Sequence, residues 1–219
     1  MVKGLSVHTN AGQLAALSHL GVTNRVLQNT QLRVTSGLKI NNPQDDSSGF
    51  QISTRIKGDI VGTNAVKTSL DLGVTTVNIA IEGGKSIKDL AIEMKGKVIQ
   101  ANQAGLDANS RTALHNDFIA LRDQINTIAL SAEFNENNII KSGATTLAVL
   151  STQDGSTITV SAQIMDSTTL QINATNLTTS ASAAAARTAI ETAISLAGDK
   201  LAALGASQKS LTIQSDFTS

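Results

Sequence analysis

The chain has 219 residues, its acidic and basic residues balance at 17 each, and aromatic residues make up only 2%. Cysteine is absent, which excludes disulfides, thiolate metal sites and cysteine nucleophiles. The neutral balance implies no polyanionic partner, and the aliphatic, aromatic-poor composition favours long helices over a bulky globular core.

No apolar run approaches the roughly 18 residues that indicate a membrane-spanning helix. The N-terminus has Lys3 but lacks the apolar core and cleavage site of a secretory signal peptide. We therefore expect no membrane insertion, and any export must use a route that needs no cleaved signal.

Residues 5–36 are predicted to form the first helix. Leu14, Leu17 and Leu20 begin an apolar pattern at helical spacing, which Val26 and Val34 continue. A helix of this kind is marginal in water without a partner, so its apolar face needs something to pack on.

A short link is predicted to follow this helix. Gly37 has the residue type that ends helices, and Asn41-Asn42-Pro43 is expected to form a rigid connection. Asp45 and Asp46 are predicted to lie in the first turn of the next helix, where the helix dipole favours negative charge. Adjacent residues point in different directions on a helix, so this interpretation is preferred over a carboxylate pair or cation site.

The same residues carry a family resemblance, because several fixed positions recur at one spacing. The run resembles the N-terminal signature of bacterial flagellins, and the resemblance is best from Val7 to Asn138 and closest to small alphaproteobacterial members. The motif that we assign to the helix join and to assembly consists of Ser36, Gly37, Leu38, Lys39, Ile40, Asn41, Asp45, Asp46 and Gly49.

Residues 44–102 show the most regular pattern of the chain, and a helix of that length would span roughly 85 Å. Such a length is typical of a coiled coil or rod. Six glycines interrupt it, and each is either a close approach to a neighbouring helix or a local kink: Gly58, Gly62, Gly73, Gly83, Gly84 and Gly96.

Residues 103–106 are predicted to break the long helix. A third helix, capped by Asp107, Asn109 or Ser110, is expected to reach Ser131 and to return antiparallel because the link is short. The turn after it resembles a flagellin turn, except that Glu136 stands where the family usually has glycine.

From Thr145 the apolar period changes to two, which predicts a small β insert. Leu147 and Val149 alternate before the turn pair Asp154-Gly155, and alternation resumes after it. Leu170 and Ile172 are predicted to form a third short strand. By resemblance, this insert stands in the place of the variable outer domains of larger flagellins.

A last helix is predicted from Thr179-Ser180 to about Ile213. Flagellins normally continue past this point into a helix that pairs with the N-terminal one, so we expect the sequence to be truncated. The N-terminal helix should then be disordered, or ordered only by packing on another molecule, and this form should polymerise poorly.

The predicted fold is mainly α: an elongated rod of long antiparallel, coiled-coil-like helices with a small β-hairpin insert. Its expected parts are an N-terminal polymerisation helix (1–36), N-terminal rod helices (37–140), the insert (141–175) and a C-terminal rod helix (176–219). The apolar residues expected to form the rod core are Ile52, Ile56, Ile60, Leu70, Val74, Val77, Ile81, Met94, Val98, Leu114, Phe118, Leu121, Ile125, Ile190, Ile194, Leu201 and Leu204.

The sequence carries no recognisable catalytic, cofactor or metal motif. His8, His19 and His115 lack metal-ligand spacing, and no phosphate loop or nucleophile elbow occurs. Basic residues are scattered and have no stacking aromatics beside them, which argues against nucleic-acid binding. We therefore expect neither an enzyme nor a cofactor.

The resemblance implies a structural subunit of the flagellar filament, self-assembling through long helices and serving swimming motility. It implies other flagellin subunits, the flagellar type III export apparatus, an export chaperone, and hook-associated and cap proteins as partners. It also implies secretion into an extracellular filament. The alternative is a hook–filament junction protein on the same scaffold.

Many flagellins are recognised by an animal innate receptor through a surface on the long helix. The corresponding stretch here is 93–99, where Glu93 replaces a basic residue, Gly96 replaces a glutamate and Lys97 replaces an apolar contact. These changes predict weak or absent receptor activation.

Overall fold

A computed structural model describes residues 10–218 of the chain. In chain order it contains α1 (Ala11–Ser36), α2 (Ser47–Ala101), α3 (Ala108–Ser131), β1 (Leu147–Leu150), β2 (Thr157–Val160) and α4 (Ser180–Thr218). The predicted mainly α fold with a small β hairpin is confirmed. The part of the first predicted helix before residue 10 lies outside the described residues.

The chain divides into two units, residues 1–60 and residues 61–219, and the 55-residue helix α2 runs through the boundary. In unit 1, the Asn10 side chain caps α1 by accepting a hydrogen bond from the Gly12 amide at 3.1 Å. None of the 26 described residues of α1 is buried. Unit 1 therefore has helices but no core beneath α1.

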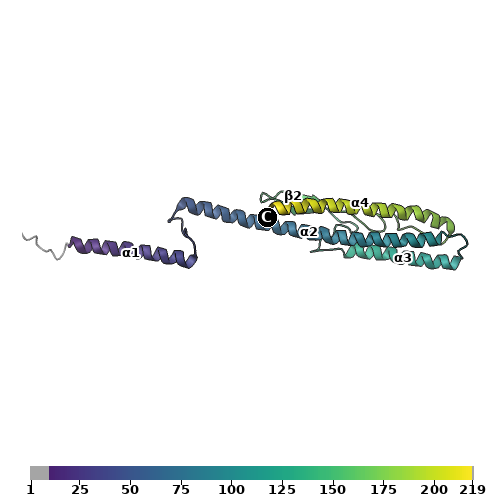
Figure 1. The fold of residues 1–219 in the computed structure, drawn as a ribbon, viewed down its shortest axis with the longest axis horizontal. Helices are drawn as coiled ribbons and strands as arrows, with labels where there is room; N and C mark the ends of the chain where they lie inside the picture. The colour runs from purple at the N-terminus through teal and green to yellow at the C-terminus, as the bar shows by residue number, and fades with distance from the viewer. Residues whose placement is uncertain (1–9, 219) are drawn as a thin grey trace, which may run out of the picture. The chain divides into compact units, whose positions relative to one another are not determined.

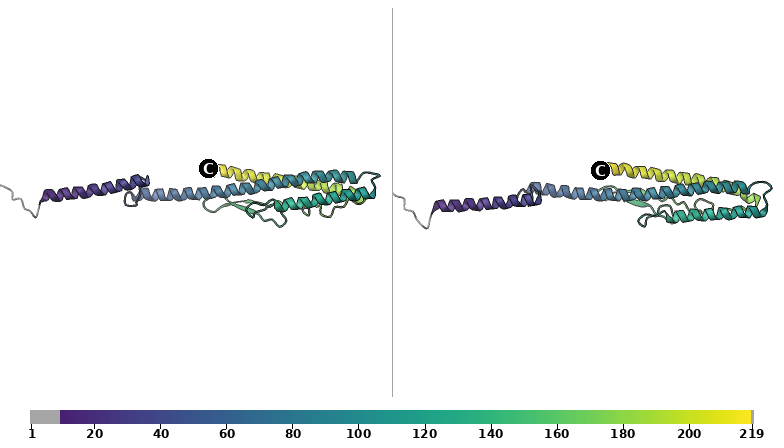
Figure 2. Two further views of the ribbon diagram at one scale, coloured as in Figure 1. Left: turned by 90° about the horizontal axis from the view of Figure 1, so that it is seen from below. Right: turned by 60° about the horizontal axis from the view of Figure 1, so that its bottom comes forward.

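Unit 2 is a bundle in which the second part of α2 lies side by side with α3 and α4 (Figure 1; Figure 2). The short turn after α2 is fixed by Arg111, whose Nε donates to the Ala101 carbonyl at 2.9 Å, and α3 returns antiparallel as predicted. Ion pairs tie α2 to both neighbours, Lys97 to Asp117 of α3 at 2.7 Å and Lys95 to Glu191 of α4 at 3.2 Å.

The core of unit 2 consists of the inward faces of these three helices together with the segment between α3 and α4. Its largest fully buried side chains are Phe118, Leu70, Ile87, Met94, Ile125, Ile139, Ile140, Met165, Leu170, Ile172, Leu177 and Ile190. These large side chains are aliphatic or methionine apart from Phe118, so the core depends on helix contact along its whole length. Four polar residues of the described part of the chain are buried as well: Thr76, Asn138, Ser151 and Ser167.

The β hairpin packs against α2. Its strands pair antiparallel, with Leu147 opposite Val160 and Leu150 opposite Thr157. The buried side chain of Val149 rests on Gly73 of α2, where an added Cβ would lie 2.6 Å from the Val149 Cγ2. The predicted hairpin is therefore present. It packs closely against α2 because Gly73 has no side chain.

The predicted third strand at Leu170 and Ile172 is wrong. These residues form a tight turn: the Leu170 amide donates to the Asp166 carbonyl and the Ile172 amide to the Ser167 carbonyl, each at 3.0 Å. Gln171 between them has a φ of +61°. The turn directs both apolar side chains into the core, and this produces the alternation that we interpreted as a strand.

For three glycines of α2, the structure favours the first interpretation given above, a close approach to a neighbour. Gly73, Gly83 and Gly84 are close approaches, where an added Cβ would lie between 2.6 and 3.0 Å from a neighbouring side chain. Around Gly58 and Gly96, no described atom lies within 4 Å of an added Cβ, apart from the helix backbone and chain neighbours. The helix continues without a break through all of them.

Candidate assembly site

The link between α1 and α2 is built by a left-handed residue and two carboxylates. Gly37 ends α1 with a φ of +67°, a conformation that glycine adopts without steric cost. The Leu38 amide then donates to the Ser36 hydroxyl at 3.3 Å, which satisfies one backbone group where the helix ends.

Asp46 caps α2 from outside the helix. Its Oδ1 accepts a hydrogen bond from the Gly49 amide at 2.9 Å, and its carbonyl accepts the Phe50 amide at 2.9 Å. A side chain at Gly49 would collide with this arrangement, since an added Cβ would lie 2.5 Å from the Asp46 Oδ2 and 2.6 Å from the Ile40 Cδ1. The motif requires its glycine because the capping carboxylate occupies that space.

The prediction that both aspartates lie in the first turn of α2 is wrong, because the helix begins at Ser47 and its first turn contains no acidic residue. Asp45 has a different role. Its Oδ2 accepts the amides of Asn41 and Asn42 at 3.4 and 3.3 Å, and its Oδ1 lies 3.8 Å from the guanidinium of Arg33. The carboxylate therefore joins the last turn of α1 to the link.

Arg33 was not identified from the sequence as part of this joint. A basic residue in the last turn of a helix was the available signal, because such a residue complements the helix dipole. Of the other motif residues, Leu38 and Lys39 are exposed, and Ile40 and Asn41 are partly buried.

The helices on both sides of the joint expose large apolar side chains. Eight such residues lie in α1, namely Leu14, Leu17, Leu20, Val22, Val26, Leu27, Leu32 and Val34. At roughly 100° of rotation per residue, Leu14 and Leu32 share one side, Val22 and Val26 a second, and the others a third. Because large apolar residues lie on three sides of α1, with polar residues between them, a single covering partner would leave some of them in water.

Three residues expected in the rod core are not in it. Ile52, Ile56 and Ile60 are 51%, 48% and 54% exposed, so the expectation is wrong for them in this chain. In unit 2, Thr63 and Val66 of α2 line one hollow together with the last residues of α4. The apolar stripe of α2 thus includes residues in unit 1 that no described residue buries.

The remaining predicted core residues lie inside unit 2. The buried ones are Leu70, Val77, Met94, Val98, Phe118, Ile125, Ile190 and Leu204. The partly buried ones, packed against that core, are Val74, Ile81, Leu114, Leu121, Ile194 and Leu201.

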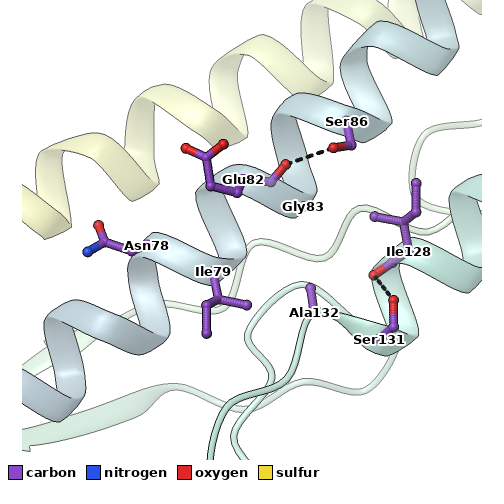
Figure 3. A pocket seen from close by; sticks show the side chains of 8 residues that line it. All are labelled: Asn78, Ile79, Glu82, Gly83, Ser86, Ile128, Ser131 and Ala132. Carbon is purple, nitrogen blue, oxygen red and sulfur yellow. Dashed lines mark hydrogen bonds between the residues drawn. The ribbon is translucent and has the colours of Figure 1, made fainter.

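A groove between α2 and the end of α3 shows how the polar groups of unit 2 are used (Figure 3). The hydroxyls of Ser86 and Ser131 donate to carbonyls of their own helices, at 3.1 and 3.3 Å, and Glu82 pairs with Lys85 at 2.7 Å. The Asn78 side chain, which also lines this groove, accepts a hydrogen bond from Gln208 of α4. Each of these polar side chains thus has a partner within unit 2.

Histidine and carboxylate side chains do not gather elsewhere in the described part of the chain. Between residues 10 and 218 no cluster of three or more His, Asp or Glu residues is placed to hold a metal ion. His19 is exposed on α1, and the His115 Nδ1 accepts the Leu177 amide at 3.4 Å, whereas His8 lies outside the described residues. Within that same range, no helix is long and apolar enough to cross a membrane.

The stretch that corresponds to the receptor surface is engaged in ion pairs. The hydrogen bond from Lys95, more than any other contact, lowers the pKa of the Glu191 carboxyl. The hydrogen bond to Asp117 likewise raises the pKa of Lys97. Both lysines are thus paired within unit 2, and the expected weakness of receptor activation stays a prediction.

A packed three-helix unit, together with helices whose apolar residues face outward, defines a structural protein of the helical, assembling class. Residues 7–146 match the bacterial flagellin N-terminal helical region, so the chain belongs to the bacterial flagellin family, the structural subunits of the flagellar filament. The predicted family and function are confirmed.

Relatives and a solved structure agree with this assignment. The chain is 37% identical over 218 residues to flagellin FljO of Caulobacter vibrioides, covering 97% of this chain and 78% of that one. It is 31% identical over 157 residues to flagellin A of Rhizobium meliloti, covering 69% and 39% of the two chains. The crystal structure of Bacillus cereus flagellin shares the fold, with a TM-score of 0.62, 24% identity, and 68% and 88% coverage.

Proposed function

We propose that the exposed apolar residues of α1, together with Ile52, Ile56 and Ile60, are the surfaces through which this flagellin packs against other copies in the filament. The observation that carries the proposal is that α1 exposes eight large apolar side chains and, over its 26 described residues, buries none. Large continuous apolar surfaces on a soluble protein mark interaction sites.

The energy available from these surfaces is large. Full burial of one Leu, Ile or Val contributes about 1.5–3 kcal/mol, so covering eight half-exposed side chains contributes on the order of 10 kcal/mol before ordering costs. Since these apolar residues lie on three sides of α1, several neighbouring helices are needed to bury all of them. A filament interior provides such neighbours, whereas a dimer with one shared face does not.

The joint gives these helices a defined connection. Gly37, Asp45 and Asp46 fix where α1 ends and α2 begins, through the cap and carboxylate bonds described above. We assign residues 1–36 to the polymerisation helix, 37–140 and 176–219 to the rod helices, and 141–175 to the hairpin insert.

Membership of the flagellin family supports a proposal for the partners and the location. We propose that the chain is secreted through the flagellar type III export apparatus with the help of a chaperone. In the extracellular filament it meets hook-associated and cap proteins. The role is structural and not enzymatic, and neither nucleic acid nor a membrane is a partner. The relatives named above are flagellins, which favours this role over the hook–filament junction.

A seeded assembly experiment tests the proposal. Filaments sheared from the bacterium that makes this chain are mixed with the soluble chain, and incorporation is measured by sedimentation and electron microscopy. This form should polymerise poorly by itself, but we expect it to join the seeds. Leu20→Asp should stay soluble, because Leu20 is 57% exposed in the single chain and the proposal requires it to become buried in the filament. The volume-conserving control Leu20→Met should behave like the original chain. Equal incorporation of Leu20→Asp would contradict the proposal.

The joint is tested with a second matched pair. Gly37→Val places a β-branched residue at a φ of +67° and should reduce incorporation strongly. Gly37→Asn should retain most of it, because asparagine tolerates the left-handed conformation. If both variants assemble equally well, the conformation of the joint has no part in assembly.

A further inference from the structure

The tip of the β hairpin carries a reactive pair of residues. Asp154-Gly155 is the single place in the 219-residue sequence where aspartate or asparagine precedes glycine. Without a Cβ, glycine lets its own amide nitrogen approach the preceding side-chain carboxyl more closely than any other residue does. We propose that Asp154-Gly155 is a site of spontaneous aspartate isomerisation, a covalent modification that goes beyond the assembly function and is independent of it.

The surroundings of the pair leave it open to reaction. Both residues are exposed, and no described atom other than their chain neighbours lies within 4 Å of a Cβ added to Gly155. The Asp154 carboxylate accepts no hydrogen bond and forms no ion pair with any described residue. The Gly155 amide is held only by a bond of 3.2 Å to the Thr152 carbonyl of the same turn. Exposed loop tips of this kind are also where local opening is easiest.

Two other aspartates in the chain serve as internal comparisons because each precedes a serine, another small residue. Asp46 has its carboxylate bonded to the Gly49 amide at 2.9 Å. Asp166 accepts the Thr169 amide at 2.7 Å, and the amide of the following Ser167 donates to the Asn126 side chain at 2.9 Å. In both cases the carboxylate is already engaged, and at Asp166 the amide of the following residue is engaged as well.

The reaction is balanced without any added reagent. The Gly155 amide nitrogen bonds to the Asp154 Cγ, the carboxyl oxygen leaves as water, and the amide proton passes to solvent, which closes a five-membered succinimide. Water then adds to one of the two ring carbonyls. Cleavage of the nitrogen–Cγ bond restores aspartate. Cleavage of the other bond leaves the chain running through Cγ as isoaspartate, with the main-chain carboxyl set free.

The product changes the hairpin end, because the main chain gains one methylene between residues 154 and 155. The closing bond from the Ser151 amide to the Ser156 carbonyl, at 2.8 Å, then loses its register. This end of the hairpin also contacts both long helices: Gln153 donates to Thr63 of α2 at 2.5 Å, and Gln214 of α4 donates to the Ser151 carbonyl at 3.1 Å. Isomerisation therefore loosens one end of unit 2.

The test is an ageing experiment on the full chain in neutral buffer at physiological temperature. Isoaspartate is located by peptide mapping with electron-transfer fragmentation, which distinguishes it from aspartate at the same mass. We expect isoaspartate at residue 154 to exceed that at residues 46 and 166 several-fold. Asp154→Glu should abolish it there, because its longer side chain would have to close a less favourable six-membered ring.

A second variant separates the chemistry of the pair from the geometry of the turn. Asp154→Asn forms the same succinimide faster, with ammonia as the leaving group, and should convert faster than the original chain ages. If isoaspartate at residue 154 stays at the level of residue 166, and the asparagine variant also stays intact, the turn forbids ring closure and the proposal is overturned.

Discussion

Helices α1 and α4 both contain many aliphatic residues, yet one is exposed to solvent and the other is packed in a core. Helix α4 buries seven residues against its neighbours in unit 2, while none of the described residues of α1 is buried. Both contain Ala and Leu together with a β-branched aliphatic residue, which is Val in α1 and Ile in α4, and neither has a run of charges. The difference teaches that a partner within the chain, and not helix composition, decides whether such a helix belongs to a core or to a surface for assembly.

The largest expected effect tests this contrast directly. Phe118→Ala should lower the free energy of unfolding by about 3–5 kcal/mol, because Phe118 is fully buried in unit 2. Leu20→Ala on α1 should change it by no more than about 0.5 kcal/mol. Urea denaturation of the soluble chain measures both changes. Similar losses of unfolding free energy from the two substitutions would contradict the proposed difference between the two helices.

Two glycines of α2 sharpen the comparison inside a single helix. Gly73→Ala should destabilise unit 2 by about 1–3 kcal/mol, because the new Cβ would lie 2.6 Å from Val149. Gly96→Ala, which meets open space, should instead stabilise it by up to about 1 kcal/mol through helix propensity. Opposite signs in thermal unfolding are expected, and a loss at both positions would count against the close-approach assignment.

Helix caps provide a smaller contrast between the units. Asp107 caps α3, and Asp107→Ala should lower the stability of unit 2, because the Asn109 and Ser110 amides lose their acceptor. Asp46→Ala removes the cap of α2 in unit 1, where it should fray the helix start without moving the unfolding midpoint of unit 2. Denaturation, combined with amide exchange at the first turn of α2, distinguishes the two outcomes.

The cap at Asp107 also predicts a pH dependence. Hydrogen bonds from the Ser110 hydroxyl, then from the Ser110 and Asn109 amides, lower the pKa of the Asp107 carboxyl. Its contribution is therefore complete above the ordinary aspartate pKa of about 3.9 and is lost as the pH falls from there through the lowered value. Asp107→Asn keeps a capping side chain and should remove this part of the acid sensitivity. An unchanged acid profile would show that other groups govern it.

The smallest effect is expected at the turn after α3. Glu136 has a φ of +65°, in the left-handed region that costs a non-glycine residue energy. Glu136→Gly should stabilise unit 2 by roughly 0.5–1 kcal/mol. Asn135→Gly, at a φ of +48°, should gain less, because asparagine tolerates this region. Losses of stability at both positions in thermal unfolding would mean that the turn is unstrained, and equal gains would mean that asparagine is no better tolerated there than glutamate.

The helices could be predicted well from the sequence, because each has a long stretch of apolar periodicity with capping residues at its ends. Asp107 and Gly37 lie at the ends expected of them, and Asp154-Gly155 lies at the hairpin tip. The prediction failed at Leu170 and Ile172, where a two-residue alternation arose from a tight turn. A pattern of two residues is too short to separate these cases.

The candidate site was only partly predictable, for a different reason. Local spacing placed Gly37 and the two aspartates at a helix join, but the pairing of Asp45 with Arg33 depends on how the link folds back. Ile52, Ile56 and Ile60 continue the same periodicity as the buried Leu70 and Val77. Periodicity identifies the apolar face of a helix, and it carries no information on where the covering helix ends.

Hydrogen exchange of the soluble chain and of assembled filaments, read by mass spectrometry, tests the central claim most directly. In the soluble chain, amides of α1 should exchange rapidly, while those of α2, α3 and α4 within unit 2 should be protected. In the filament α1 should become protected, because other copies cover its apolar side chains, and the protection of unit 2 should change little. An α1 that is already protected in the soluble chain, or that stays unprotected in the filament, would contradict the account.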